Sequence, residues 1–235
     1  MGTMDHGDRS TQVKAVSVAR HHIFDLKYRL GDLRHSAIRE AMVVRVRPSA
    51  LLVLAPHSVT HHRGGREKAA EFWTGAVAES VAEAFGGSLI SAIGSREEAE
   101  TAASDDAFNE LARHVVAATG ARWVVDIHGL AARHQVDINI GTAGCRGDNN
   151  VTRSVQSLER TFDVSVDTPF DGSSGLSRSL ADSTGVRGVQ LELGTRLRRD
   201  AVTSADLNAL VDGLALLVAD GRSADSALAM PPRGW

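Results

Sequence analysis

The sequence lacks the features that mark several classes of protein. Among 235 residues there is a single cysteine, Cys145, so an internal disulfide is excluded. Aromatic residues make up 4% of the chain, which argues against stacked aromatic platforms for single-stranded nucleic acid. No apolar run approaches the roughly 18 residues of a membrane span, and residues 1–10 lack the apolar core of a secretory signal. We therefore expect a cytoplasmic protein that binds neither membrane nor nucleic acid.

Neither sign of charge is in strong excess. The formal net charge is -3, with 43% hydrophobic and 23% charged residues. This balance gives no general attraction for nucleic acid or an anionic membrane. The length suits one globular core, so we expect a single domain over residues 1–235, with 1–41 as a variable N-terminal segment and 221–235 as a tail.

Short apolar runs alternate with segments of helical periodicity. Strands are expected over Met42–Arg47, Ala50–Ala55, Ser88–Ile93, Arg122–His128, Val136–Ile140, Val164–Val166 and Gly188–Gly194. Helices are expected over Glu67–Phe85, Ser104–Gly120, Val151–Phe162 and Leu207–Val218. This alternation is typical of a three-layer α/β/α sandwich with a mostly parallel or mixed central sheet, whose active site lies at the carboxyl ends of the strands.

Polar side chains occur where three of the predicted strands end. His57 follows one strand, His128 ends a second, and Glu192 lies near the end of a third, while Glu67 begins a predicted helix ten residues after His57. Two imidazoles and one carboxylate are a known ligand set of catalytic zinc, with a fourth position for water. We therefore predict one zinc ion per chain, held by His57, Glu67 and His128, with Glu192 as the general base.

Each of these assignments has a simpler alternative. His61 or His62 could be the first ligand instead, because both follow in the same loop. Glu67 could be only a first-turn acid that is favoured by the helix dipole. Glu192 could form a structural ion pair with an arginine that follows its strand. The sequence alone leaves these alternatives open.

Four short motifs occur in order between residues 50 and 200. They are Ala55-Pro-His57 with Glu67, Asp126-Ile-His128-Gly129, Val136-Asp-Ile-Asn-Ile-Gly141 and Val189-Gln-Leu-Glu192-Leu-Gly194. Together they resemble the N-formylglutamate amidohydrolase family, which is related in fold to zinc carboxypeptidases and aspartoacylases. The dense His-x-x-Glu motif of those relatives is absent, and the longer spacing is similar to that of phage-type poly-γ-glutamate hydrolases. The resemblance implies the same zinc ligands and Glu192 as the catalytic acid/base.

The resemblance also implies arginines that hold a substrate carboxylate and polarise the scissile carbonyl. Arg133 and Arg196 are favoured because each closely follows a motif strand, and Arg96 and Arg146 are further candidates. An arginine fork matches a carboxylate in a bidentate manner, so an acidic amino-acid moiety is the expected substrate group.

Three more polar residues belong to the expected site. Asp137 and Asn139 share one strand face and could line the substrate pocket, and Asp126 shares a face with His128, whose orientation it could fix. The expected function is zinc-dependent hydrolysis of the amide of a small N-acyl, for instance N-formyl, amino acid. The alternatives are a zinc carboxypeptidase, a poly-γ-glutamate or peptidoglycan-type amidase, and a non-catalytic binding protein on the same fold. The expected partners are a small or short peptide-like substrate and, as an option, further copies of the chain.

Overall fold

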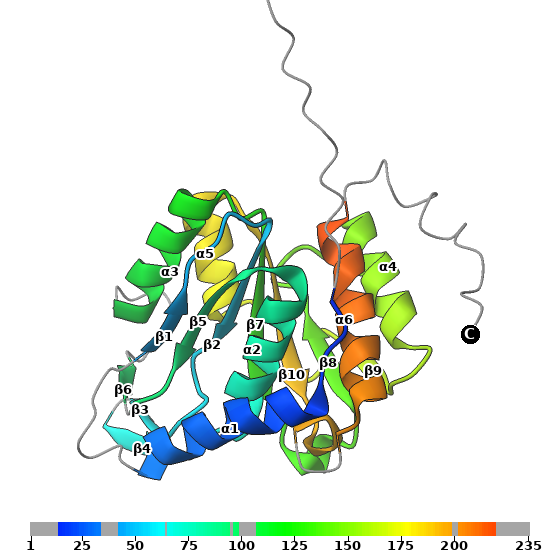
Figure 1. Cartoon of the computed structure of the whole chain (residues 1–235). Helices are drawn as coiled ribbons and strands as arrows, with labels where there is room; N and C mark the ends of the chain where they lie inside the picture. Colours follow the sequence, from blue (N-terminus) through cyan, green and yellow to red (C-terminus); the bar gives the residue numbers. More distant parts are fainter. Residues whose placement is uncertain are drawn as a thin grey trace, which may run out of the picture.

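The computed structural model describes residues 14–33, 42–63, 65–94, 96–98, 107–198 and 202–219. A seven-stranded sheet in the order β1-β5-β2-β7-β10-β8-β9 lies at its centre (Figure 1). Strands β5, β2, β7 and β10 run parallel, whereas β1, β8 and β9 run in the opposite direction. The strands are β1 (Met42–Arg45), β2 (Leu51–Ala55), β5 (Ser88–Ala92), β7 (Trp123–Gly129), β8 (Ile138–Gly141), β9 (Val164–Val166) and β10 (Arg187–Leu193). The predicted mixed, mostly parallel α/β fold is confirmed.

Helices cover both faces of this sheet (Figure 1). Alternate residues of β2 face opposite ways: Leu51 and Val53 pack with α2, α4 and α6, while Leu52 and Leu54 pack with α3 and α5. Helix α1 lies against α2. Among the described residues, no helix has the length and apolarity needed to cross a membrane. The helices are α1 (Val18–Leu33), α2 (Thr74–Phe85), α3 (Ala107–Thr119), α4 (Asn149–Leu158), α5 (Leu176–Thr184) and α6 (Ser204–Val218).

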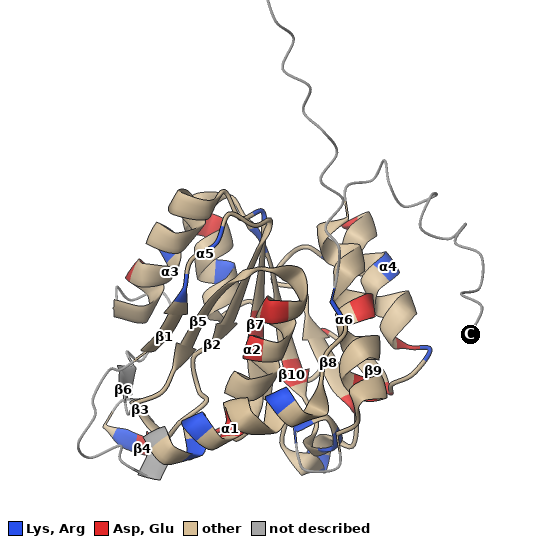
Figure 2. Cartoon of the chain, in the orientation of Figure 1, with Lys and Arg blue, Asp and Glu red and all other residues tan. Residues whose placement is uncertain are grey.

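Ion pairs join α1 to the helix beneath it. Arg20 of α1 pairs with Glu83 of α2, and Lys27 pairs with Glu79, so that basic residues of α1 lie beside acids of α2 (Figure 2). The Glu79 side chain is buried at 1% exposure, and Nη2 of Arg45 in β1 lies 3.6 Å from its Oε2. A buried carboxylate must be paired, and here two cations satisfy that requirement.

The predicted helix over Glu67–Phe85 is wrong in its first part. Strand β3 (His61–Arg63) and strand β4 (Arg66–Lys68) form a hairpin there, and β6 (Arg96–Glu98) completes a second, three-stranded sheet. Helix α2 begins only at Thr74, after Trp73 with a left-handed φ of 75°. The helical spacing of apolar residues extended the prediction backwards past Trp73 and into β4, whose Glu67 and Lys68 pair with β3.

Helix α5 was not expected, because its sequence is rich in serine and carries only a few apolar residues. Ser177 and Leu180 are its buried side chains, and the helix packs on β10 at Gly188. A Cβ at Gly188 would lie 2.6 Å from the Ser177 carbonyl oxygen, so this approach requires glycine. The start of the helix predicted from Ser104 and the tail 221–235 lie outside the described residues, as do parts of the N-terminal segment.

Candidate metal centre

His57, Glu71 and His128 bring their ligand atoms together at the carboxyl ends of β2 and β7. Nδ1 of His57 lies 3.4 Å from Oε1 of Glu71, and Nδ1 of His128 lies 3.5 Å from Oε2. One ligand atom from each of the three residues lies within 4.8 Å of the other two. The two imidazole rings have centroids 4.7 Å apart at an interplanar angle of 73°. Nitrogen, nitrogen and carboxylate oxygen are a donor set that suits zinc.

Main-chain hydrogen bonds hold the acid of this cluster against both histidine segments. The Glu71 N–H donates to the carbonyl of His57 at 2.9 Å. The Gly129 N–H donates to Oε2 of Glu71 at 2.8 Å. Gly129, which follows His128, therefore holds the carboxylate of Glu71. The carbonyl of His57 holds the backbone N–H of Glu71.

The structure does not bring Glu67, the acid expected from the sequence, into the cluster. Glu67 lies in β4, opposite His62 in the hairpin register, and its Oε2 is 3.9 Å from the Nε2 of that histidine. Its side chain is 65% exposed. Glu71 lies in the extended stretch between the hairpin and α2. The Gly64-Gly65 pair between short polar segments is a hairpin signal that could have moved the assignment to the next acid along the chain.

The structure also shows which of the three histidines after β2 belongs to the cluster. His57, and not His61 or His62, contributes to the cluster. The ring of His61 stacks on that of His57 with centroids 4.2 Å apart and an interplanar angle of 4°. Its Nδ1 lies 3.4 Å from the Val59 carbonyl oxygen. His61 thus packs against the first histidine of the cluster.

Strand register places two more acids on the same sheet face. The parallel strands β7 and β10 align His128 with Glu192 and Asp126 with Gln190, so all four side chains project to one side. Asp126 is 0% exposed, and its Oδ1 lies 3.2 Å from Nε2 of His128. Within the described part of the chain neither oxygen of Asp126 has another hydrogen-bond partner. A carboxylate on the far nitrogen of an imidazole is the usual support for a metal-binding histidine.

The charges in this site shift the pKa values of Glu71 and His128. Burial opposes ionisation of Glu71, but His57 and His128 outweigh it and hold the pKa of Glu71 well below its usual range. Burial likewise opposes protonation of His128, yet Asp126 and Glu71 raise its pKa well above the ordinary value. A divalent cation would take the place of that proton, so metal affinity should depend on pH.

The pKa of Glu192 is shifted in the direction that suits a proton carrier. Burial is the main cause of its raised pKa, and the nearby carboxylates Glu71 and Asp126 add to the effect, while His128 opposes it. Gln190 donates from Nε2 to Oε1 of Glu192 at 2.7 Å, which fixes the carboxyl group. A raised pKa makes a carboxyl group a stronger proton acceptor, and the same group can later return the proton.

Three residues expected to bind substrate make contacts within the protein. Arg196 donates to Oδ2 of Asp137 and to Oδ1 of Asp206, each at 2.7 Å. Asn139 is fully buried; its amide nitrogen lies 2.9 Å from the Thr168 carbonyl, and its Oδ1 accepts from Phe170. Asp137 and Arg196 thus form an ion pair, and Asn139 forms hydrogen bonds with the backbone of the loop after β9.

The other arginine candidates differ in their positions. Arg133 is exposed in the short 3-10 helix η1 (Ala132–His134), four residues after Gly129, the last residue of β7. Arg146 is 75% exposed and lies 3.6 Å from Oδ2 of Asp167. The side chain of Arg96 lies outside the described residues. Arg133 and Arg196 therefore both stay predictions for a substrate-binding arginine.

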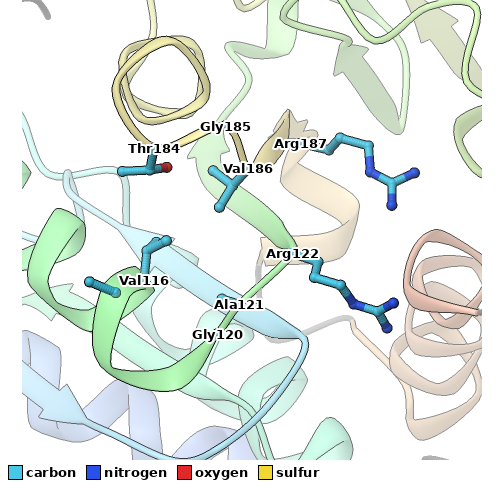
Figure 3. Close-up of a pocket in the computed structure, with 9 residues that line it drawn as sticks. Val116, Gly120, Ala121, Arg122, Thr184, Gly185, Val186 and Arg187 are labelled. Atoms are coloured by element: carbon cyan, nitrogen blue, oxygen red, sulfur yellow. The ribbon is translucent and has the colours of Figure 1, made fainter.

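A cavity of about 570 Å³ lies at the opposite end of the sheet (Figure 3). It is bounded by Val116 and Thr184 near the ends of α3 and α5, and by Arg122 and Arg187 at the starts of β7 and β10. The two arginine side chains extend in the same direction in Figure 3. Because the histidine cluster is at the carboxyl ends of these strands, this cavity is not part of the candidate metal centre.

No protein-family model matches the sequence, and a search of curated proteins gives no significant match. Among solved structures, a bacteriophage poly-gamma-glutamate hydrolase matches with 16% identity over 80% of this chain and 90% of that chain, at a TM-score of 0.50. The N-formylglutamate amidohydrolase from Ralstonia eutropha JMP134 matches with 14% identity over 75% and 95%, at 0.46. A metallo-carboxypeptidase from Burkholderia cenocepacia matches with 11% identity over 75% and 58%, at 0.40. The chain shares its fold with the bacteriophage hydrolase.

Proposed function

We propose that this protein is a metal-dependent hydrolase that cleaves the amide bond of a small, acidic N-acyl amino acid. The observation that carries the proposal is the convergence of His57, Glu71 and His128 within 4.8 Å, on the sheet rim where Glu192 is also placed. The fold shared with a poly-gamma-glutamate hydrolase, a protein named for hydrolysis of a glutamyl amide, is consistent with this reaction class.

The three clustered residues would hold a zinc ion, and Asp126 would keep His128 in the orientation that binding requires. The donor set fits, and the buried Asp126 carboxylate without other partners gives the imidazole a fixed proton acceptor on its far side. Bound zinc would supply Lewis acidity, polarising the substrate carbonyl and lowering the pKa of water.

Glu192 would perform the proton transfers. In its ionised form it accepts a proton from the water that attacks the carbonyl carbon. It then returns that proton to the amide nitrogen as the carbon–nitrogen bond breaks, so the amine leaves neutral and no proton is gained or lost by the enzyme. Its raised pKa and its hydrogen bond from Gln190 suit both halves of this role.

Paired acid substitutions test the metal site. Purified protein should contain about one zinc per chain, because three protein ligands form one catalytic zinc site. Glu71→Gln should lose the metal, while the matched substitution Glu67→Gln, at an exposed position four residues away, should keep it. Metal analysis after dialysis is the measurement. Full occupancy in Glu71→Gln, or loss in Glu67→Gln alone, would exclude the assignment.

A second variant separates catalysis from metal binding. Glu192→Gln should retain zinc and lose most hydrolysis, because the amide cannot accept the proton. Activity is measured as amine release from N-formyl, N-acetyl and γ-glutamyl amides of amino acids. Near-normal turnover in Glu192→Gln would remove Glu192 as the base, and no release from any substrate by the zinc-loaded wild type would contradict the proposed reaction.

A further inference from the structure

Arg198 ends the short 3-10 helix η2 (Thr195–Arg198) and donates to carbonyl groups of three separate chain segments. Its Nε donates to Leu193 at 2.6 Å, its Nη1 to Phe72 at 3.0 Å and its Nη2 to Leu130 at 3.0 Å. The three nitrogens of one guanidinium group are thus all used, and each on a different segment. Guanidinium is planar and rigid, so these three carbonyls are held at fixed positions relative to one another.

Each of these carbonyls belongs to a residue close to the candidate site. Phe72 directly follows Glu71, Leu193 directly follows Glu192, and Leu130 comes two residues after His128. We propose that Arg198 is a positioning residue that fixes the segments of Glu71, His128 and Glu192 against one another. The inference rests on the proposed metal centre, and it adds a residue that neither binds the metal nor contacts the reacting atoms.

The packing at Gly129 supports this role. A Cβ at Gly129 would lie 2.8 Å from both Cζ and Nη1 of Arg198, and 3.0 Å from Cβ of Glu71. The guanidinium therefore occupies space that any other residue next to His128 would fill. The same glycine donates its N–H to the Glu71 carboxylate, so the arginine and the ligand acid meet at one point of the backbone.

The carbonyl of Leu193 joins two of the three segments a second time. It accepts from the N–H of Leu130 at 2.8 Å as well as from Nε of Arg198. Hydrogen bonds from a charged donor are stronger than those between neutral groups. The ends of β7 and β10, which carry His128 and Glu192, are thus tied by a backbone bond and by the arginine together.

Arg187 offers a matched control for removal of an arginine. It lies at the start of β10, donates from Nη1 to Oδ2 of Asp148 at 2.8 Å and has its guanidinium carbon 4.6 Å from the centre of the Trp123 ring. Arg187→Ala therefore removes partly exposed contacts at the start of β10, the end of this strand that is remote from the metal centre.

The experiment compares Arg198→Ala, Arg198→Lys and Arg187→Ala by two readouts. Zinc affinity is measured by competition with a chelator, and amide hydrogen exchange is measured on the metal-free proteins. Arg198→Ala should lower zinc affinity about 10- to 100-fold, the range found when supporting contacts of metal ligands are removed. Exchange should accelerate together at the amides of Glu71, Leu130 and Gly194. Arg198→Lys keeps the charge but not the fork, so it should give intermediate values, and Arg187→Ala should leave zinc affinity unchanged.

Two results would overturn the inference. One is a zinc affinity in Arg198→Ala equal to that of the wild type. The other is faster exchange confined to the neighbourhood of residue 198 itself. If Arg198→Ala does not fold, the Arg198→Lys variant carries the same comparison. Absence of zinc binding by the wild type would refute the metal centre, and hydrogen exchange would still show whether the three segments are held jointly.

Discussion

A buried histidine of helix α1, His21, should make the protein sensitive to acid. His21 is 0% exposed, its Nδ1 lies 3.2 Å from Oγ of Ser80, and its ring stacks on Trp73 with centroids 5.3 Å apart. Burial, followed by repulsion from His22, lowers the pKa of His21 from 6.5 to about 4. The folded protein therefore keeps this imidazole neutral at pH values where the unfolded chain protonates it.

The sign and size of the effect follow from these two pKa values. Above pH 6.5 the imidazole is neutral in both the folded and the unfolded state, so its titration does not lower the free energy of unfolding. Between pH 6.5 and about 4 only the unfolded state binds the proton, so the free energy of unfolding falls as the pH falls. At about 1.4 kcal/mol for each pH unit, the full loss is about 3 kcal/mol.

Denaturant unfolding of wild type and His21→Phe, measured between pH 7.5 and about pH 4, isolates this contribution. Phenylalanine keeps a ring against Trp73 but cannot titrate, and it loses the hydrogen bond with Ser80, worth about 1 kcal/mol. The variant should be the less stable protein at neutral pH and the more stable one near pH 4. The other titratable groups are the same in both proteins, so their effects cancel in the difference between the two free energies of unfolding. Parallel stability curves across this range would refute the reasoning.

Three further substitutions test single features of the structure. Asp126→Asn replaces the buried carboxylate beside the His128 imidazole and should weaken zinc binding about 10- to 100-fold in chelator competition; an unchanged affinity would exclude this support. Gly188→Ala puts a Cβ 2.6 Å from the Ser177 carbonyl oxygen and should lower the free energy of unfolding by about 1–3 kcal/mol; an unshifted denaturation midpoint would contradict the tight packing of α5. Thr203→Ala removes a capping box shared with Asp206 at the start of α6 and should cost about 1 kcal/mol in the same assay, with no loss showing that the cap contributes nothing.

The sequence predicted the part of the site that depends on parallel strands. His57 and His128 stand where buried apolar runs end, and such runs align their carboxyl ends at one rim whatever their order in the sheet. Glu192 could be placed on the same rim because its strand alternates polar and apolar residues. Local patterns are sufficient for these positions, since the sheet itself supplies the long-range geometry.

The acid of the cluster could not be placed by such patterns. Glu67 and Glu71 lie four residues apart, and the choice between them depends on a hairpin that pairs with β6 from a later part of the chain. Arg198 is still harder to recognise, because its partners are main-chain carbonyls, which every residue carries. The contacts of Asn139 with the backbone of Thr168 and Phe170 are hidden from the sequence for a related reason, and its place in a substrate pocket stays a prediction.

The hairpin β3–β4 lies in the segment that connects His57 to Glu71. A backbone hydrogen bond joins the two ends, from the Glu71 N–H to the His57 carbonyl at 2.9 Å, and it can hold these two residues together whatever the number of residues between them. Insertions or replacements within 62–68, beyond the His61 ring that stacks on His57, should therefore reshape the rim of the site and leave His57 and Glu71 in place. This segment is the natural place to exchange loops when the substrate preference of the protein is to be engineered.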